Sequence, residues 1–121
     1  TFPASPAVTI PAGGYILVVK NPAAFAWRYG AMPGVTILGP YEDDTKLSNG
    51  GERLELSKPG DEDEADGTRY YIRVDRVNYD DAIPWPDNTP EGGGDSIERI
   101  NVNLYGNDPN NWRADIPSPG E

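Results

Sequence analysis

The sequence contains neither cysteine nor histidine among its 121 residues. Without cysteine the chain can form no disulfide and no thiolate metal site. Without histidine it lacks the commonest general base and metal ligand, which narrows the classes of enzyme that it could represent. It also has no apolar run long enough to span a bilayer, so we expect no membrane insertion.

Large aliphatic residues are few, and hydrophobic residues make up 36% of the sequence. With a net charge of -10, this composition comes close to that of disordered chains. Three Trp and seven Tyr argue instead for a folded domain, because large aromatic rings can fill a small core. We therefore expect one domain over residues 1–121 with long ordered loops. The acidic charge makes nucleic acid an improbable partner and would repel anionic membranes.

Gly and Pro punctuate the chain throughout, which favours β structure over helix bundles. One short helix is expected at Ala23–Tyr29, since Asn21 is suited to an N-cap, Pro22 to the first helical position and Gly30 to the end. Apolar runs and alternating segments predict strands at Tyr15–Val19, Val35–Leu38, Arg53–Ser57, Tyr70–Tyr79 and Ser96–Ile100. Lys58–Gly67 reads as a polar hairpin tip, and the residues from Asn101 onward as an irregular tail. Together these elements predict an all-β sandwich.

Two local patterns add detail to the predicted strands. Asn49, Gly50 and Gly51 form a tight turn before a strand that places Leu54 and Leu56 on one face. In the Tyr70–Tyr79 strand the apolar alternation slips by one residue, which predicts a β-bulge near Asp75 or Arg76. The expected core consists of Tyr15, Leu17, Val19, Leu54, Leu56, Ile72, Val74, Trp85 and Trp112.

Five blocks in order along the chain resemble the lamin-tail domain in its bacterial, secreted form. They are PAGGYILVVKNPAAF at Pro11–Phe25, LGPYEDDTKLSNGGERLEL at Leu38–Leu56, VDRVNYDDAIPWP at Val74–Pro86, GGGDSIERI at Gly92–Ile100 and NNWRADIPSPG at Asn110–Gly120. The resemblance runs from Phe2 to Gly120. It implies an immunoglobulin-like β-sandwich with one short helix and long irregular loops, and no catalytic activity.

The resemblance also implies that the first strands of such a domain are missing, because no block of the type E-[WY]-[IV]-E-[LI]-x-N precedes Thr1. Removing early strands from a sandwich leaves backbone groups without partners and opens the apolar core. We therefore expect an exposed sheet edge in the N-terminal half, or strand pairing with other protein chains or neighbouring domains, including a possible homo-oligomer.

The acidic run after Pro59 suggests a calcium site, because Ca²⁺ takes several carboxylate and carbonyl oxygens from flexible loops. Asp61 and Asp63 have the spacing of a D-x-D loop, and Asp66 is a third candidate ligand. Ala65 stands where a further ligand should fall, and no bidentate Glu follows at the right distance. The competing interpretation, which we favour, is a solvated hairpin tip.

Other patterns have structural explanations that we favour over chemical ones. A sugar-stacking platform of Trp85, Trp112, Tyr79 and Tyr105 competes with packing at the ends of the sandwich. Paired carboxylates of the glycosidase type are expected by chance among twenty acids. Surface ion pairs are expected for Arg76 with Asp75, Arg99 with Glu98 and Arg113 with Asp115.

The sequence thus predicts a non-catalytic structural or interaction module of a secreted or cell-surface bacterial protein, with no catalytic residues and no cofactor. Its role would be spacing, adhesion or protein interaction. The alternative is a calcium-assisted carbohydrate-binding module that is accessory to an enzyme.

Overall fold

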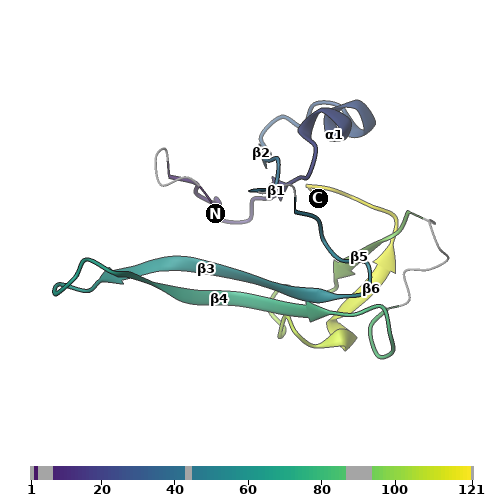
Figure 1. The fold of residues 1–121 in the computed structure, drawn as a ribbon. Helices are drawn as coiled ribbons and strands as arrows, with labels where there is room; N and C mark the ends of the chain where they lie inside the picture. The colour runs from purple at the N-terminus through teal and green to yellow at the C-terminus, as the bar shows by residue number, and fades with distance from the viewer. Residues whose placement is uncertain (1, 3–6, 43–44, 87–93, 121) are drawn as a thin grey trace. The chain divides into compact units, whose positions relative to one another are not determined.

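The computed structural model describes residues 2, 7–42, 45–86 and 94–120. Strands predominate over helix in this part of the chain, which confirms the expected mostly-β class. The chain divides into two compact units, Thr1–Lys46 with Ser118–Glu121, and Leu47–Pro117. Figure 1 shows the elements of both units. The expectation of a single domain over residues 1–121 stays a prediction.

The first unit contains a parallel strand pair with a helix between its strands. β1 (Ile16–Val18) pairs with β2 (Thr36–Leu38), with Leu17 opposite Ile37. The next backbone bond, from Val19 N to Leu38 O at 2.8 Å, extends the pairing by one residue. Parallel strands need a crossover connection, and the helix lies within it. The sequence had indicated both strands but not their parallel arrangement.

Helix α1 (Pro22–Tyr29) confirms the predicted start and end signals. Asn21 Oδ1 accepts a hydrogen bond from Ala24 N at 3.0 Å, and Pro22 occupies the first turn, where an N–H has no helical partner. Gly30 ends the helix with φ of 73°, in the region that favours glycine. Phe25 and Tyr29 lie on the same side, with ring centroids 4.8 Å apart.

The second unit is built around a long antiparallel hairpin, β3 (Glu52–Glu62) and β4 (Arg69–Tyr79) (Figure 1). β3 runs five residues further than the sequence indicated, so the tip is shorter than Lys58–Gly67. The tip closes through backbone bonds of 2.8 Å from Asp63 N to Thr68 O and from Gly67 N to Asp63 O. At the other end, Gly51 enters the hairpin with φ of 99°, as the predicted turn requires.

The slipped alternation in β4 is absorbed by a bulge, as predicted. Leu56 pairs with Asp75 and Ser57 with Arg73, so Val74 is the extra residue, immediately before Asp75. Because one residue is inserted, Ile72 on one side of the bulge and Val77 on the other face the same way. A second shift, between Pro59 and Glu62, lies near the tip.

The remaining strands, β5 (Ser96–Arg99) and β6 (Trp112–Asp115), form a short antiparallel pair. A single-turn 3-10 helix, η2 (Pro109–Asn111), leads into β6, and Asp108 Oδ1 caps it by accepting from Asn110 N at 3.0 Å. The expectation of an irregular tail beyond Asn101 was therefore wrong for Trp112–Asp115. Those four residues lack a clear apolar run, and their strand depends on pairing with β5.

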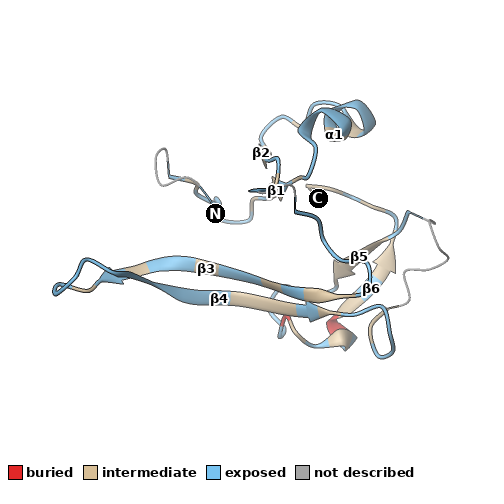
Figure 2. Cartoon of the chain, in the orientation of Figure 1, coloured by how far each residue is buried: buried red, intermediate tan, exposed pale blue. Residues whose placement is uncertain are grey.

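The predicted core is not buried, which corrects the sequence interpretation. Among the described residues no apolar side chain is buried, and Tyr15, Ile72 and Val74 are 50%, 54% and 57% exposed (Figure 2). Leu56 is also exposed, whereas Leu17, Val19, Leu54, Trp85 and Trp112 are partly buried. The three described sheets have two strands each, and Leu56, Tyr70 and Ile72 on one face of the hairpin are exposed.

Candidate interaction surface

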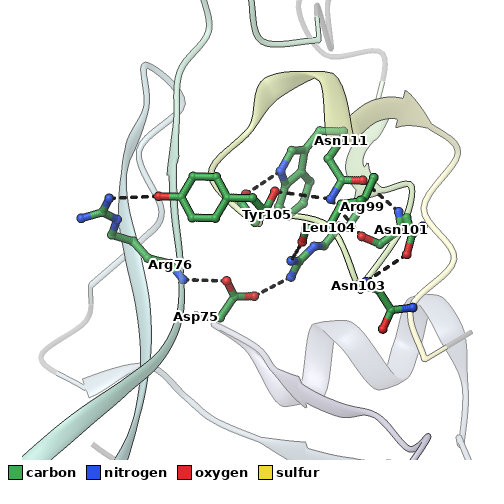
Figure 3. Close-up of polar contacts among 10 residues, drawn as sticks. Asp75, Arg76, Arg99, Asn101, Asn103, Leu104, Tyr105 and Asn111 are labelled. Atoms are coloured by element: carbon green, nitrogen blue, oxygen red, sulfur yellow. Dashed lines mark hydrogen bonds and ion pairs between the residues drawn. The ribbon is translucent and has the colours of Figure 1, made fainter.

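A polar network fastens the loop between β5 and β6 to strand β4 (Figure 3). Arg99 Nη1 donates to Asp75 Oδ2 at 2.5 Å, and its Nη2 donates to the backbone oxygen of Leu104 at 2.5 Å. Asp75 Oδ1 accepts from the backbone N–H of Arg76 at 2.9 Å. The carboxylate and the guanidinium are thus both committed to holding the chain in place.

Asn111 is the centre of this network and the one polar side chain that is buried among the described residues, at 3% exposure. Its Oδ1 accepts from Asn101 N at 3.0 Å, and its Nδ2 donates to Asn101 O at 2.9 Å. A longer bond of 3.4 Å joins Nδ2 to Tyr105 O. The side chain therefore replaces a missing backbone partner for the loop, as buried amides commonly do.

The loop held in this way leaves its apolar side chains exposed. Ile100, Val102 and Leu104 are all more than half exposed, while Asn101 Oδ1 is used by Asn103 N at 2.9 Å. Sequence analysis missed this loop. The signal available was the alternation of Asn with Ile, Val and Leu in INVNL, which has the period of a strand although no strand forms there.

The β3–β4 hairpin has one apolar face and one charged face. The register places Leu54 opposite Val77 and Lys58 opposite Ile72, so alternation puts these residues and Leu56 on one face. An added Cβ at Gly60 would lie 3.3 Å from Ile72 Cγ1, which places Ile72 over Gly60 on that face. Lys58 lies on this face, as does Asp75, which is opposite Leu56. We call the apolar residues of this face, Leu54, Leu56, Tyr70, Ile72 and Val77, the apolar hairpin face.

The opposite face carries Arg53, Glu55 and Arg73. Arg53 Nη2 pairs closely with Glu55 Oε2, and Arg73 Nη1 lies 4.0 Å from the same oxygen. The hydrogen bond from Arg53 is the main cause that lowers the pKa of Glu55 below its ordinary value. Glu55 therefore stays ionised in the native hairpin to a lower pH than a free Glu side chain would.

The acidic tip uses its carboxylates for turn formation. Asp63 Oδ1 accepts from Ala65 N and Asp66 Oδ1 from Thr68 N, both at 2.8 Å. The hydroxyl and then the amide of Thr68 lower the pKa of Asp66. No three acidic groups of the described residues are grouped so that they could hold a metal ion. The calcium assignment of Asp61, Asp63 and Asp66 stays a prediction, which calcium-dependent thermal melting tests.

The four aromatic residues of the predicted sugar platform have polar or ring partners inside the second unit. Trp85 and Trp112 pack against each other with centroids 6.2 Å apart and planes tilted by 52°. Trp112 Nε1 donates to Gly106 O at 2.8 Å, and Tyr79 Oη donates to Ser48 O at 2.6 Å. Tyr105 Oη accepts from Arg76 at 3.4 Å. These contacts favour the packing interpretation.

Two of the expected ion pairs have other partners. Arg113 does pair with Asp115, at 3.0 Å, and also approaches Glu98 at 3.5 Å. Arg99, however, pairs with Asp75 rather than with its neighbour Glu98, and the Arg76 side chain donates to Tyr105 rather than to Asp75. Neighbours on a strand point to opposite faces, so adjacent charges in the sequence are poorly placed to pair.

No family model matches the chain, and searches of curated proteins and of solved structures found no match either. No described helix is long and apolar enough to cross a membrane. The arrangement of the described residues is therefore the basis for a functional proposal, together with the resemblance in the sequence.

Proposed function

We propose that this chain is a non-catalytic structural and interaction module of a secreted or cell-surface bacterial protein, and that its fold is an immunoglobulin-like β-sandwich. The five ordered sequence blocks that resemble lamin-tail domains support the family, the fold and the location. The module acts by contact with other polypeptides, in spacing, adhesion or protein interaction.

The observation that carries the proposal is the exposed apolar hairpin face. Tyr70 and Ile72 are 60% and 54% exposed, on a strand whose charged residues lie mainly on the other face. Exposed contiguous apolar surface with a polar border is characteristic of protein–protein contacts. A two-stranded sheet is also marginal alone and gains stability when another layer or strand is added.

The polar chemistry of the second unit supports a structural role. The side chains of Asp75, Arg99 and Asn111 are engaged in bonds that hold the loop between β5 and β6. Catalytic groups usually converge on a cleft, with a nucleophile or base left able to reach a substrate. Here the convergent groups are directed at the chain's own backbone.

The acidic charge of the hairpin tip indicates what kind of polypeptide would bind the hairpin. The hairpin ends in Asp61, Glu62, Asp63, Glu64 and Asp66, and the chain carries a net charge of -10. A polypeptide with alternating apolar residues and a cationic end matches the apolar hairpin face and the acidic tip together.

A peptide-display selection against the full chain tests the proposal. Selected peptides are measured by fluorescence polarisation on the parent protein and on two matched variants, Ile72→Lys on the apolar hairpin face and Tyr71→Lys on the opposite face. Both residues are exposed, at 54% and 62%, so neither change need unfold the chain. We expect Ile72→Lys to weaken binding by about tenfold or more and Tyr71→Lys to leave it nearly unchanged. Equal effects of the two variants, or none, would contradict the proposal.

A further inference from the structure

The outer edge of β3 has no hydrogen-bonded strand beside it among the residues that the structure describes. In an antiparallel pair, residues alternate between those whose N–H and C=O face the partner and those that face away. Asn78 donates its N–H to Asn107 Oδ1 at 2.5 Å, so it faces away from β3. Its partner Arg53, and by alternation Glu55, therefore present backbone N–H and C=O groups to the free edge of β3.

The outer edge of β4 is less suited to accept another strand. Asn107 caps it at Asn78, and a Cβ added to Gly106 would lie 3.2 Å from Arg76 O, so the loop between β5 and β6 lies against this part of the edge. The part nearer the tip carries Arg69 and Arg73. These would face each other if the strand paired with its own copy about Tyr71, and like charges directly opposite are unfavourable.

We propose that β3 pairs, antiparallel and about a two-fold axis at Leu54, with β3 of a second copy of this chain. In this register Arg53 lies opposite Glu55 of the second copy, and Glu55 opposite its Arg53. The outward-facing backbone groups of Arg53 and Glu55 meet their counterparts, as a hydrogen-bonded pair requires. The contact is isologous, with the same surface used on both copies.

The pairing joins two hairpins into one four-stranded sheet whose faces are continuous. A two-fold axis perpendicular to the sheet keeps each face on its own side, so Leu54 and Leu56 of both copies share the apolar side. The Arg53–Glu55 ion pairs of the two copies share the charged side, where each Glu55 gains a third Arg beside Arg53 and Arg73 of its own chain. Opposite charges across strands stabilise a pairing, and the two-fold axis doubles the contribution.

Neighbouring registers of the pairing between the two β3 strands are unfavourable because of charge or of hydrogen bonding. Centred on Glu55, the pairing would set Glu55 against itself. Centred on Leu56, it would set Arg53 opposite Pro59, which has no N–H to donate. Centred on Ser57, it would set Glu55 opposite Pro59. Registers shifted by one residue from these are excluded. In them, a residue whose backbone groups face the second copy would lie opposite a residue whose backbone groups face β4.

This inference deepens the proposed function and rests on it, since it names a second copy as one partner of the hairpin. Different experimental results would contradict the pairing of copies and the proposed function. Peptide binding that depends on Ile72 concerns the apolar hairpin face, whereas pairing of copies concerns the edge of β3. A monomeric chain that still binds peptides through Ile72 would overturn the pairing and leave the proposed function in place.

Disulfide trapping tests the register, and the absence of native cysteine makes it clean. In a non-hydrogen-bonded antiparallel pair, opposite Cα atoms lie about 4.5 Å apart, within the range that a disulfide spans. Leu54→Cys should therefore give a covalent dimer under mild oxidation. Leu56→Cys is the control, because its two copies would be offset by four residues, about 13 Å along the strand. A covalent dimer with Leu56→Cys that equals or exceeds that with Leu54→Cys would overturn the register.

Charge exchange provides a second, independent test that needs no cross-link. Sedimentation velocity over a concentration series gives the dimer dissociation constant of the full chain. Arg53→Glu alone and Glu55→Arg alone should each raise it by about tenfold, because like charges then face each other across the axis. The double variant Arg53→Glu with Glu55→Arg should restore the parent value. A chain that stays monomeric at millimolar concentration, or singles that match the parent, would refute the pairing.

Discussion

Asp75 on β4 and Arg99 on β5 are 24 residues apart in the sequence and are joined at 2.5 Å between Oδ2 and Nη1. This ion pair connects the hairpin to the smaller β5–β6 sheet within the second unit. The Arg99 side chain is 20% exposed, so water screens the pair less than it screens the ion pairs between other described residues of this unit.

Replacing Asp75 with Ala should lower the free energy of unfolding by about 1–3 kcal/mol, since Arg99 loses a charged partner and the N–H of Arg76 loses its acceptor. Urea unfolding of the parent and the variant measures the difference. Arg113→Ala is the control, because its ion pairs with Glu98 and Asp115 are more exposed and we expect a change within about 0.5 kcal/mol. Equal losses in the two variants would show that Asp75 has no special role.

Asn111→Ala should cost about 1–3 kcal/mol, because it leaves the backbone N–H and C=O of Asn101 without their buried partner. Its neighbour Asn110 offers a matched control, since its exposed amide donates to Asp108 and its replacement by Ala should be nearly neutral. Amide exchange at Asn101 should speed up in the Asn111 variant alone. Unchanged amide exchange at Asn101 in the Asn111→Ala variant would show that the Asn111 side chain does not hold the loop.

Substitution by Ala should destabilise the protein at Gly51 and leave its stability nearly unchanged at Gly50. A Cβ at Gly51 would lie 2.5 Å from Tyr79 O, on a residue with φ of 99°, so backbone strain of about 1–3 kcal/mol is expected. A Cβ at Gly50 would meet nothing closer than Asp81 Oδ2 at 3.9 Å. The melting temperatures of the two variants measure this difference. A Gly51→Ala protein as stable as the Gly50→Ala protein would contradict the turn geometry.

The pKa of Asp66 should lie below its ordinary value, because the Thr68 side chain and amide donate to the ionised form. A lowered pKa means that the stabilising contribution is present above the unfolded-state pKa and is lost as pH falls through the folded-state pKa. Thr68→Val should raise the Asp66 pKa in an NMR titration, while Thr68→Ser, which retains the hydroxyl, should leave it low. The same pKa in both variants would exclude the hydroxyl as the cause.

The sequence predicted the local features of the backbone, namely the ends of the helix and the bulge in β4. Asn21, Pro22 and Gly30 set the bounds of α1 because capping depends on residues within one turn, and the slip between Val74 and Val77 predicted the bulge because strand alternation is a short-range property. Asp75 with Arg99 could not be found in this way, since their approach depends on how distant strands are placed.

The same limit explains the error over the core. Alternation correctly put Leu54 and Leu56 on one face of β3, yet it says nothing about which layer covers that face. In the described part of the second unit each sheet has two strands, and Leu56 remains exposed. Similarly, β6 has no apolar pattern of its own and forms through its backbone pairing with β5.

Residue-resolved amide exchange on β3, followed by NMR at increasing protein concentration, tests most directly whether the edge of the hairpin is a surface for a second copy of the chain. The N–H groups of Leu54 and Leu56 face β4 and should exchange slowly at every concentration. Those of Arg53 and Glu55 face the free edge and should exchange quickly in dilute solution, then slow together as copies pair. Fast exchange of Arg53 and Glu55 at all concentrations up to millimolar, with Leu54 and Leu56 still protected, would contradict the pairing of copies along β3.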